Sequence, residues 1–256
     1  HSLDRIGDFY DGPGTRGFDT TTQAHYLYGR PDVYYRVSSW RGTWPGEGGG
    51  LLVNQCIHNL DVLQWLVGLP ESIFARVDFG RYHQIDVEDA VSALMTFGNG
   101  ATGVLVASSG EAPGVNRLEL VGDRGSITCE GETIELATSS QSVAEHCRTT
   151  SEMFGMPEFE RQTLSDFATV NQHAAVLENF VAAIADGAAL LTPGTEGLGS
   201  LQLANAMLLS AWTDARVQLP VDGAAYEAAL QQRINASSLR EPDNIEVKID
   251  MDASYR

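Results

Sequence analysis

Positive charge is scarce in this sequence, and lysine is almost missing. The 256 residues include 16 lysines and arginines against 34 acidic residues, which gives a formal net charge of -18, and the one lysine is Lys248. Such a chain repels the phosphate backbone of nucleic acids and the anionic surface of membranes. We therefore expect neither nucleic acid nor membrane among its partners.

Cysteines and long apolar runs are also few. Three cysteines stand without metal-type spacing at positions 56, 129 and 147. An odd count without such spacing argues against a disulfide framework and fits a reducing compartment. No apolar run approaches the roughly 20 residues that cross a bilayer, and the first residues, His1–Arg5, do not begin a signal peptide. We expect a cytoplasmic protein.

The hydrophobic pattern predicts a mixture of helices and strands. One helix is expected over Leu51–Val67, ended by Gly68 and Pro70. Further helices are expected over residues 173–185, 197–213 and 223–234. Strands are expected over residues 73–79, 90–97, 101–107, 117–121, 126–130 and 133–137.

The connections between these strands are short. Gly98-Asn99-Gly100 is a strong hairpin signal, and connections of this length do not allow parallel crossovers. We therefore expect an α+β fold with a largely antiparallel sheet. Residues 1–32 are expected to be an irregular segment before a domain over 33–256, residues 139–163 a loop, and residues 245–249 strand-like.

A glycine pattern near the start has the form of a dinucleotide fingerprint. Gly12-Pro13-Gly14-Thr15-Arg16-Gly17 matches G-x-G-x-x-G. A true fingerprint follows a buried strand and opens a helix, and neither flank has that pattern. Pro13 also removes an amide donor. We interpret the segment as a glycine-rich loop.

Polar residues share one face of the expected helix over 51–67. Asn54, His58 and Asp61 are spaced i, i+4 and i+7 among mostly apolar neighbours. A buried polar side chain must find partners or line a cavity, since leaving it unpaired costs roughly 1–3 kcal/mol. Two interpretations stay open at this point. The stripe is either a structural network or a site in which His58 moves protons near neutral pH.

Gly48, Gly49 and Gly50 precede that helix. Without side chains, the backbone there can approach another segment or a flat ring closely. The free amides of a helix N-terminus would favour a partial negative charge. A flexible loop would have the same composition.

Several runs, taken in order, resemble the C-terminal domain of the Gfo/Idh/MocA oxidoreductases. The longest is Trp40-Arg-Gly-Thr-Trp-Pro-Gly-Glu-Gly-Gly-Gly-Leu-Leu-Val-Asn-Gln-Cys-Ile-His-Asn-Leu-Asp61. Agreement continues through Ile85–Asp89, Phe97–Ala101, Glu119–Gly125, Leu177–Phe180, Pro193–Gly197 and Ser210–Trp212. The resemblance covers about residues 33–235.

The resemblance implies a fold and a role. Members of this family join an N-terminal Rossmann domain, which binds NAD or NADP, to a C-terminal domain. The C-terminal domain has an open, largely antiparallel sheet with helices on one face, as in dihydrodipicolinate reductase, and its sheet usually packs against another subunit. The substrate, commonly a sugar, cyclitol or polyol, lies between the two domains. This sequence has no Rossmann domain, so the cofactor is not expected to bind this chain alone.

The resemblance also implies site residues. His58 matches the family's catalytic histidine, and Asn54 stands where an aspartate is common. Asp61 would orient the imidazole or have a structural role. Gly48–Gly50 and Arg41 are expected near the cofactor. Trp40, Tyr35 and His173 are expected near the substrate, although core packing or a surface cap would explain them as well. The family's catalytic lysine, in a Glu-Lys-Pro motif, has no counterpart here, because Lys248 lies in the C-terminal tail.

Two functions therefore remain. In one, the chain is the substrate-binding and oligomerisation domain of an NAD(P)-dependent dehydrogenase, completed by a Rossmann domain on a separate chain or on a missing portion. In the other, it is a binding or assembly module that kept the fold and lost catalysis. No metal site is expected: Asp86, Glu88 and Asp89 alternate at a strand start and so point to different faces.

Overall fold

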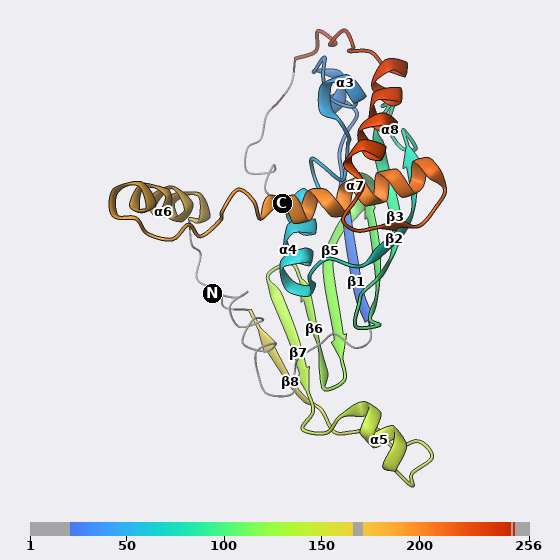
Figure 1. Ribbon diagram of the computed structural model, residues 1–256, viewed down its shortest axis with the longest axis vertical. Coiled ribbons are helices and arrows are strands. Elements are labelled where there is room, and N and C mark those ends of the chain that lie inside the picture. Colours follow the sequence, from blue (N-terminus) through green and yellow to red (C-terminus); the bar gives the residue numbers. More distant parts are fainter. Residues whose placement is uncertain (1–20, 166–170, 247, 249–256) are drawn as a thin grey trace.

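A computed structural model describes residues 21–165, 171–246 and 248, and a nine-stranded sheet runs through it (Figure 1). The strand order is β8-β7-β6-β5-β1-β4-β3-β2-β9. Neighbouring strands are antiparallel except for the pair β1 and β4, which is parallel. The strands are β1 (Thr21–Gly29), β2 (Ser72–Phe79), β3 (Glu88–Thr96), β4 (Thr102–Ser108), β5 (Gly110–Gly122), β6 (Gly125–Glu130), β7 (Thr133–Thr138), β8 (Glu160–Leu164) and β9 (Val217–Gln218). The expected fold class, an open and largely antiparallel sheet with helices, is confirmed.

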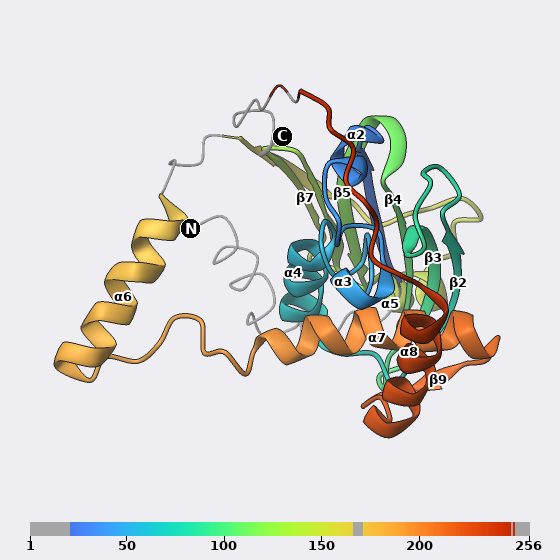
Figure 2. The same ribbon diagram turned by 90° about the horizontal axis from the view of Figure 1, so that it is seen from above.

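The described helices are α2 (Val33–Arg36), α3 (Trp44–Glu47), α4 (Ile57–Val67), α5 (Val143–Thr149), α6 (Gln172–Asp186), α7 (Gly197–Thr213) and α8 (Gly223–Ala236). α7 covers one face of the sheet at β2, and α4 and α8 pack against α7 (Figure 2). α7 lies on β2 and α4, and its buried Ser210 hydroxyl accepts the amide of Ala75 at 2.9 Å. Leu203 and Met207 of α7 pack in the same core as Leu60 and Leu63 of α4. The expected helices over 197–213 and 223–234 are confirmed.

The chain becomes regular earlier than the sequence pattern indicated. Residues up to 32 were expected to be irregular, and this is wrong for residues 21–29. These residues form β1, which lies inside the sheet between β5 and β4. Thr22, Ala24 and Tyr26 are buried on one face. Few of the strand's residues are strongly apolar, and this weakened its signal. Residues 1–20, with the Gly12–Gly17 loop, lie outside the described residues.

The expected loop over residues 139–163 is also wrong. The segment contains α5 and leads into β8, an edge strand paired with β7. The Ser142 side chain caps α5 by accepting the amide of Glu145. None of the residues of α5 is buried, so no apolar period marks the helix. Residues 245, 246 and 248 are not in a strand, and positions 247 and 249 lie outside the described residues.

α6 forms as expected but lies apart from the sheet (Figures 1 and 2). Its apolar residues line one side and are exposed: Val176, Leu177, Phe180, Val181 and Ile184 are 43–72% accessible. A helix of this composition normally packs that side against another element. Here the side is uncovered in the described part of the chain.

Candidate active site

The segment before α4 forms a succession of turns. The helix expected from Leu51 begins only at Ile57, and residues 51–55 form turns. The amide of Leu51 donates to the Glu88 carbonyl at 3.0 Å, and the amide of Leu52 donates to Glu88 Oε1 at 2.9 Å. Because β3 takes these two amides, the segment is fixed to the sheet before the helix starts. Asn54 therefore lies in the turns, and only His58 and Asp61 lie on α4.

Glu88 is a fully buried carboxyl group beneath these turns. Burial raises its pKa to about 7, against the opposing effect of the amides that it accepts. Its second oxygen, Oε2, is buried without a hydrogen-bond partner in the described residues. The carboxyl group therefore anchors the site segment to β3, and burial destabilises its ionised form.

The glycine run has a structural explanation. Gly48 has φ +72° and ends α3 in the left-handed conformation. A Cβ on Gly50 would lie 2.4 Å from the Glu88 carbonyl oxygen, and one on Gly49 would lie 2.9 Å from Val53. The close approach expected from the sequence is thus made, and its partner is this chain's own β3 and turn.

His58 and Asp61 lie on the solvent side of α4. Both side chains are exposed, as is Trp65 one turn further on. Asp61 accepts a hydrogen bond from Gln64 at 3.2 Å. The expected burial of this polar stripe is therefore not seen, because Leu60 and Leu63 turn the opposite side of the helix to the core. The stripe is open to a ligand or to a covering domain.

Asn54 is held by two neighbouring side chains, Glu47 and Tyr34. Its Nδ2 donates to Glu47 Oε1 at 2.5 Å, and its Oδ1 accepts from the Tyr34 hydroxyl at 3.5 Å. Glu47 also accepts the amide of Gly42 at 2.7 Å. Burial raises the pKa of Glu47, while Gly42, Asn54 and Arg41 oppose the rise. Glu47 had no sequence signal beyond its place beside the glycines.

Arg41 and Trp40 adjoin this group through aromatic contacts. The Arg41 guanidinium lies 4.1 Å from the centre of the Tyr34 ring and 4.7 Å from that of Trp40. Trp40 is 41% exposed. Cation–π contacts of this kind hold an arginine flat against rings. Arg41 is therefore placed beside Asn54 and Glu47, with an exposed indole next to it.

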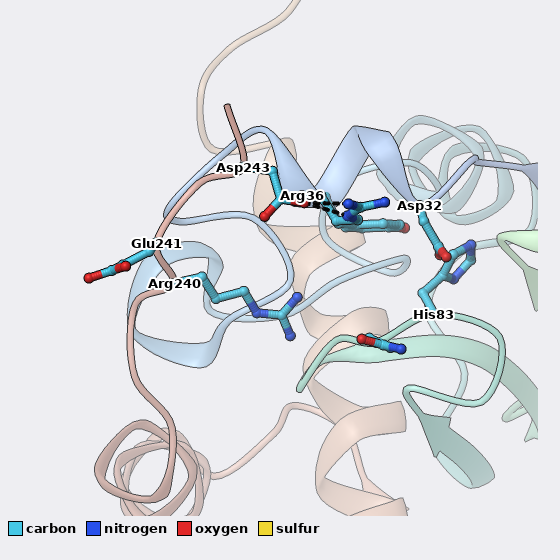
Figure 3. Close-up of a pocket in the computed structure, with 8 residues that line it drawn as sticks. Asp32, Arg36, His83, Arg240, Glu241 and Asp243 are labelled. Carbon is cyan, nitrogen blue, oxygen red and sulfur yellow. Dashed lines mark hydrogen bonds and ion pairs between the residues drawn. The ribbon is translucent and has the colours of Figure 1, made fainter. Parts of the chain in front are cut away.

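Tyr35 faces a different region from Tyr34. It lines a cavity of about 360 Å³ between α2, the loop at residues 83–84 and the tail at residues 240–243 (Figure 3). Neither Asn54 nor His58 lines this cavity. Burial raises the pKa of Tyr35 to about 12, and its hydroxyl contacts Ser109 at 3.5 Å. His173 is exposed on α6, which lies apart. The structure thus does not bring Tyr35 or His173 to Asn54.

Asp89, the neighbour of Glu88, has a structural role. Its carboxylate accepts the amides of Arg81, Tyr82 and His83 at 2.7–3.0 Å. The His83 ring contacts Asp89 at 3.2 Å and the Arg30 carbonyl at 2.8 Å. The carboxyl groups of Glu88 and Asp89 thus bind groups on opposite sides of β3, as the alternation of side chains along a strand predicted. In the part of the chain that the structure describes, no cluster of three or more His, Cys, Asp or Glu could hold a metal.

The described residues do not fit a nicotinamide dinucleotide by themselves. A dinucleotide fold needs parallel strands joined by a crossover helix. Among the described strands, the one parallel pair, β1 and β4, is separated by helices and by two antiparallel strands. The amides of Leu51 and Leu52, near the glycine run, already bind Glu88. A cofactor would have to be held by another domain.

Comparison with known proteins identifies the class. Residues 16–128 match the model of the GFO/IDH/MocA C-terminal domain. The resemblance inferred from the sequence is thereby confirmed: residues 16–128 are similar to the C-terminal domain of the Gfo/Idh/MocA family.

Individual relatives are dehydrogenases of sugar-like compounds. Inositol 2-dehydrogenase of Rhizobium meliloti (strain 1021) is 27% identical over 181 residues, which are 64% of this chain and 48% of that protein. The structure of the WlbA dehydrogenase from Bordetella pertussis, in complex with NADH and UDP-GlcNAcA, aligns with a TM-score of 0.65 and 25% identity. That alignment covers 86% of this chain and 60% of the WlbA chain. Levoglucosan dehydrogenase, in complex with NADH and L-sorbose, shares the fold at 19% identity, with a TM-score of 0.64 over 86% of this chain and 62% of that chain.

This chain therefore spans about half to three fifths of the length of these relatives.

The described helices include none that is both long and apolar enough for a membrane span.

Proposed function

We propose that the chain is the substrate-binding and oligomerisation domain of an NAD(P)-dependent dehydrogenase that acts on a sugar, cyclitol or polyol. The observation that carries this is the arrangement of Asn54, Glu47, Tyr34 and Arg41 directly before α4, on which His58 lies exposed. Relatives over most of this chain are an inositol 2-dehydrogenase and a dehydrogenase whose structure contains NADH and UDP-GlcNAcA.

In this proposal the chain's residues bind the substrate and move a proton. Asn54 holds a substrate hydroxyl, and His58 accepts the proton of the reacting hydroxyl. Asp61 orients His58, Arg41 lies toward the cofactor, and Trp40 packs on the apolar face of the sugar ring. The redox step belongs to a nicotinamide cofactor on a Rossmann domain, supplied by a longer form of the chain or by a separate polypeptide.

The exposed sides of α4 and α6 support a partner domain that would cover them. His58, Asp61 and Trp65 on α4, and the apolar side of α6, have no cover in the described part of the chain. A partner domain over these helices would bury the apolar side chains and close the site. If catalysis has been lost, the same surfaces would serve a binding or assembly module.

The sheet offers a surface for a second copy. On the face opposite α7, Phe74, Leu94 and Val104 stand side by side in register across β2, β3 and β4. Phe74 is 41% and Leu94 58% exposed. An uncovered apolar row favours association.

One experiment tests the proposal as a whole. The chain is combined with a Rossmann domain, as a fusion or as a separate polypeptide, and polyol-dependent reduction of NAD or NADP is followed by absorbance. Reduction with inositol, levoglucosan or a UDP-sugar supports the enzyme. Binding of these compounds without any reduction supports the module.

A further inference from the structure

The Asn54 amide lies between a carboxyl group and a phenol. Its Nδ2 is 2.5 Å from Glu47 Oε1, and its Oδ1 is 3.5 Å from the Tyr34 hydroxyl. An asparagine amide has a donor end and an acceptor end, and the partners decide which end points where. An ionised carboxylate only accepts hydrogen bonds. The donor end of Asn54 must therefore face Glu47.

Glu47 is itself held in place. Its second oxygen accepts the amide of Gly42 at 2.7 Å. Gly42 has φ +68°, and a Cβ there would lie 2.6 Å from Ile85, so the turn that presents this amide is tightly packed. The carboxyl group is half-buried at the end of α3. Glu47 is thus a fixed acceptor that two donors share.

Tyr34 is fixed on the opposite side. The Arg41 guanidinium covers its ring at 4.1 Å, and the Tyr35 ring meets it edge-on at 5.1 Å. The hydroxyl supplies one proton to Asn54 Oδ1. A carbonyl oxygen has two lone pairs, so one acceptor position of Oδ1 is left over.

We propose that Glu47 is a positioning residue that fixes the Asn54 amide with its carbonyl oxygen away from Glu47, on the Tyr34 side, so that the remaining acceptor position of this oxygen takes a hydrogen bond from a substrate hydroxyl. The contact with a substrate hydroxyl, here called the substrate clause, rests on the proposed function, whereas the orientation of the Asn54 amide does not. An alcohol supplies the required proton and the corresponding ketone does not. Asn54 therefore favours the alcohol by roughly tenfold, the value of one ordinary hydrogen bond.

Glu47→Gln inverts this arrangement without removing it. The Gly42 amide still needs an acceptor, so the carbonyl oxygen of the new side chain turns toward Gly42. Its NH₂ group then faces Asn54, and the Asn54 amide must rotate to offer its oxygen. The donor end of Asn54 now lies on the Tyr34 side. Adding Asn54→Asp to this variant restores an acceptor on that side, because a carboxylate accepts at both ends.

The orientation is tested first by NMR on the chain without ligand. In the wild type the Asn54 side-chain amide protons should show their stronger cross-relaxation to the Glu47 methylene protons. In Glu47→Gln they should show it to the Tyr34 ring protons. Wild-type amide protons that lie against Tyr34, or an unchanged pattern in Glu47→Gln, would overturn the proposal.

Binding of inositol and levoglucosan, measured by calorimetry on the chain combined with a Rossmann domain, tests the substrate clause. Glu47→Gln should weaken binding about tenfold, and the double variant Glu47→Gln with Asn54→Asp should recover most of it. A role of Glu47 confined to the Gly42 turn predicts wild-type binding in Glu47→Gln, since that bond is kept, and this result would sink the proposal. If the wild-type chain binds neither compound, the proposed function and the substrate clause fail together, and NMR still decides the orientation. Glu135→Gln, an exposed position on β7, is the matched control for the loss of one charge.

Discussion

Glu88 Oε1 accepts the backbone amide of Leu52 at 2.9 Å, and this bond joins β3 to a turn 36 residues earlier in the sequence. The Glu88 carbonyl accepts the amide of Leu51 beside it. Two consecutive amides thus bind β3 at the position where the sequence pattern predicts the start of the helix. The position of Asn54, just after this anchor and before α4, depends on a side chain that lies on another element.

The first prediction concerns this anchor and pH. The pKa of Glu88 is raised by burial to about 7 in the folded chain, above the value near 4.5 in the unfolded chain. The folded state therefore binds more protons between these values, and its stability falls as pH rises from about 4.5 to 7. The slope is roughly 1 kcal/mol per pH unit at its steepest.

Glu88→Gln removes the ionisable group and keeps the acceptor for Leu52. We expect its melting temperature to exceed that of the wild type at pH 8 and the difference to shrink toward pH 5. Thermal unfolding across this range measures it, with Glu135→Gln as an exposed control. Identical pH profiles for Glu88→Gln and the wild type would show that Glu88 is not the group that titrates.

The second prediction concerns Glu47. Its pKa is raised, first by burial, while the charged groups around it include Arg41 and the buried Glu88. Only the ionised form fixes the amide of Asn54 in the proposed orientation. Binding of inositol or levoglucosan should therefore fall as pH is lowered, at a higher pH than an exposed glutamate would give. Glu47→Gln should remove this pH dependence of binding. Calorimetry at several pH values measures it, and a dependence that persists in the variant would contradict the prediction.

β2 and β4 lie within a few residues of their expected positions, because buried and less buried residues alternate along each of them. β3, α7 and α8 also lie close to their expected positions. β1 was missed because few of its residues are strongly apolar, and α5 because it has 7 residues and none of them is buried. The apolar side of α6 was read correctly, but a sequence pattern does not say what covers it.

The site was predictable only in part, for the same reason. His58 and Asp61 follow from the spacing of a helix. The start of α4 depends on Glu88, and the position of Asn54 depends on Glu47 and Tyr34. These residues lie 7–36 positions away in the sequence from the groups that they bind. Periodicity carries no information about such contacts, so Glu47 had no signal of its own.

A third prediction is that the chain associates through the outer face of its sheet. Leu94→Glu places a charge in the apolar row beside Phe74 and Val104 and should yield monomers. Leu239→Glu is a matched control, since both leucines are 58% exposed and Leu239 lies in the C-terminal tail. Light scattering at micromolar concentration decides it, and a wild-type monomer would remove the proposed interface.

A fourth prediction is that this chain alone binds neither NAD(H) nor NADP(H). The described strands form no dinucleotide fold, and the amides near the glycine run are already bonded to β3. Titration calorimetry should show no saturable heat for any of the four nucleotides. Micromolar affinity for one of them would mean that the chain holds a cofactor site of its own.

The last prediction concerns His58 in an enzyme completed by a Rossmann domain. The side chain is exposed on α4, opposite the buried Leu60 and Leu63. Its removal therefore takes nothing from the core, and His58→Ala should leave the melting temperature nearly unchanged. As the proton acceptor, His58 contributes an expected factor of about 10²–10⁴ to turnover, so the variant should lose that much. Gln64→Ala, which removes the hydrogen-bond donor to Asp61 on the same helix, should lose far less. Turnover and melting temperature are measured on the same preparations. Full turnover in His58→Ala, with the fold intact, would take His58 out of the mechanism.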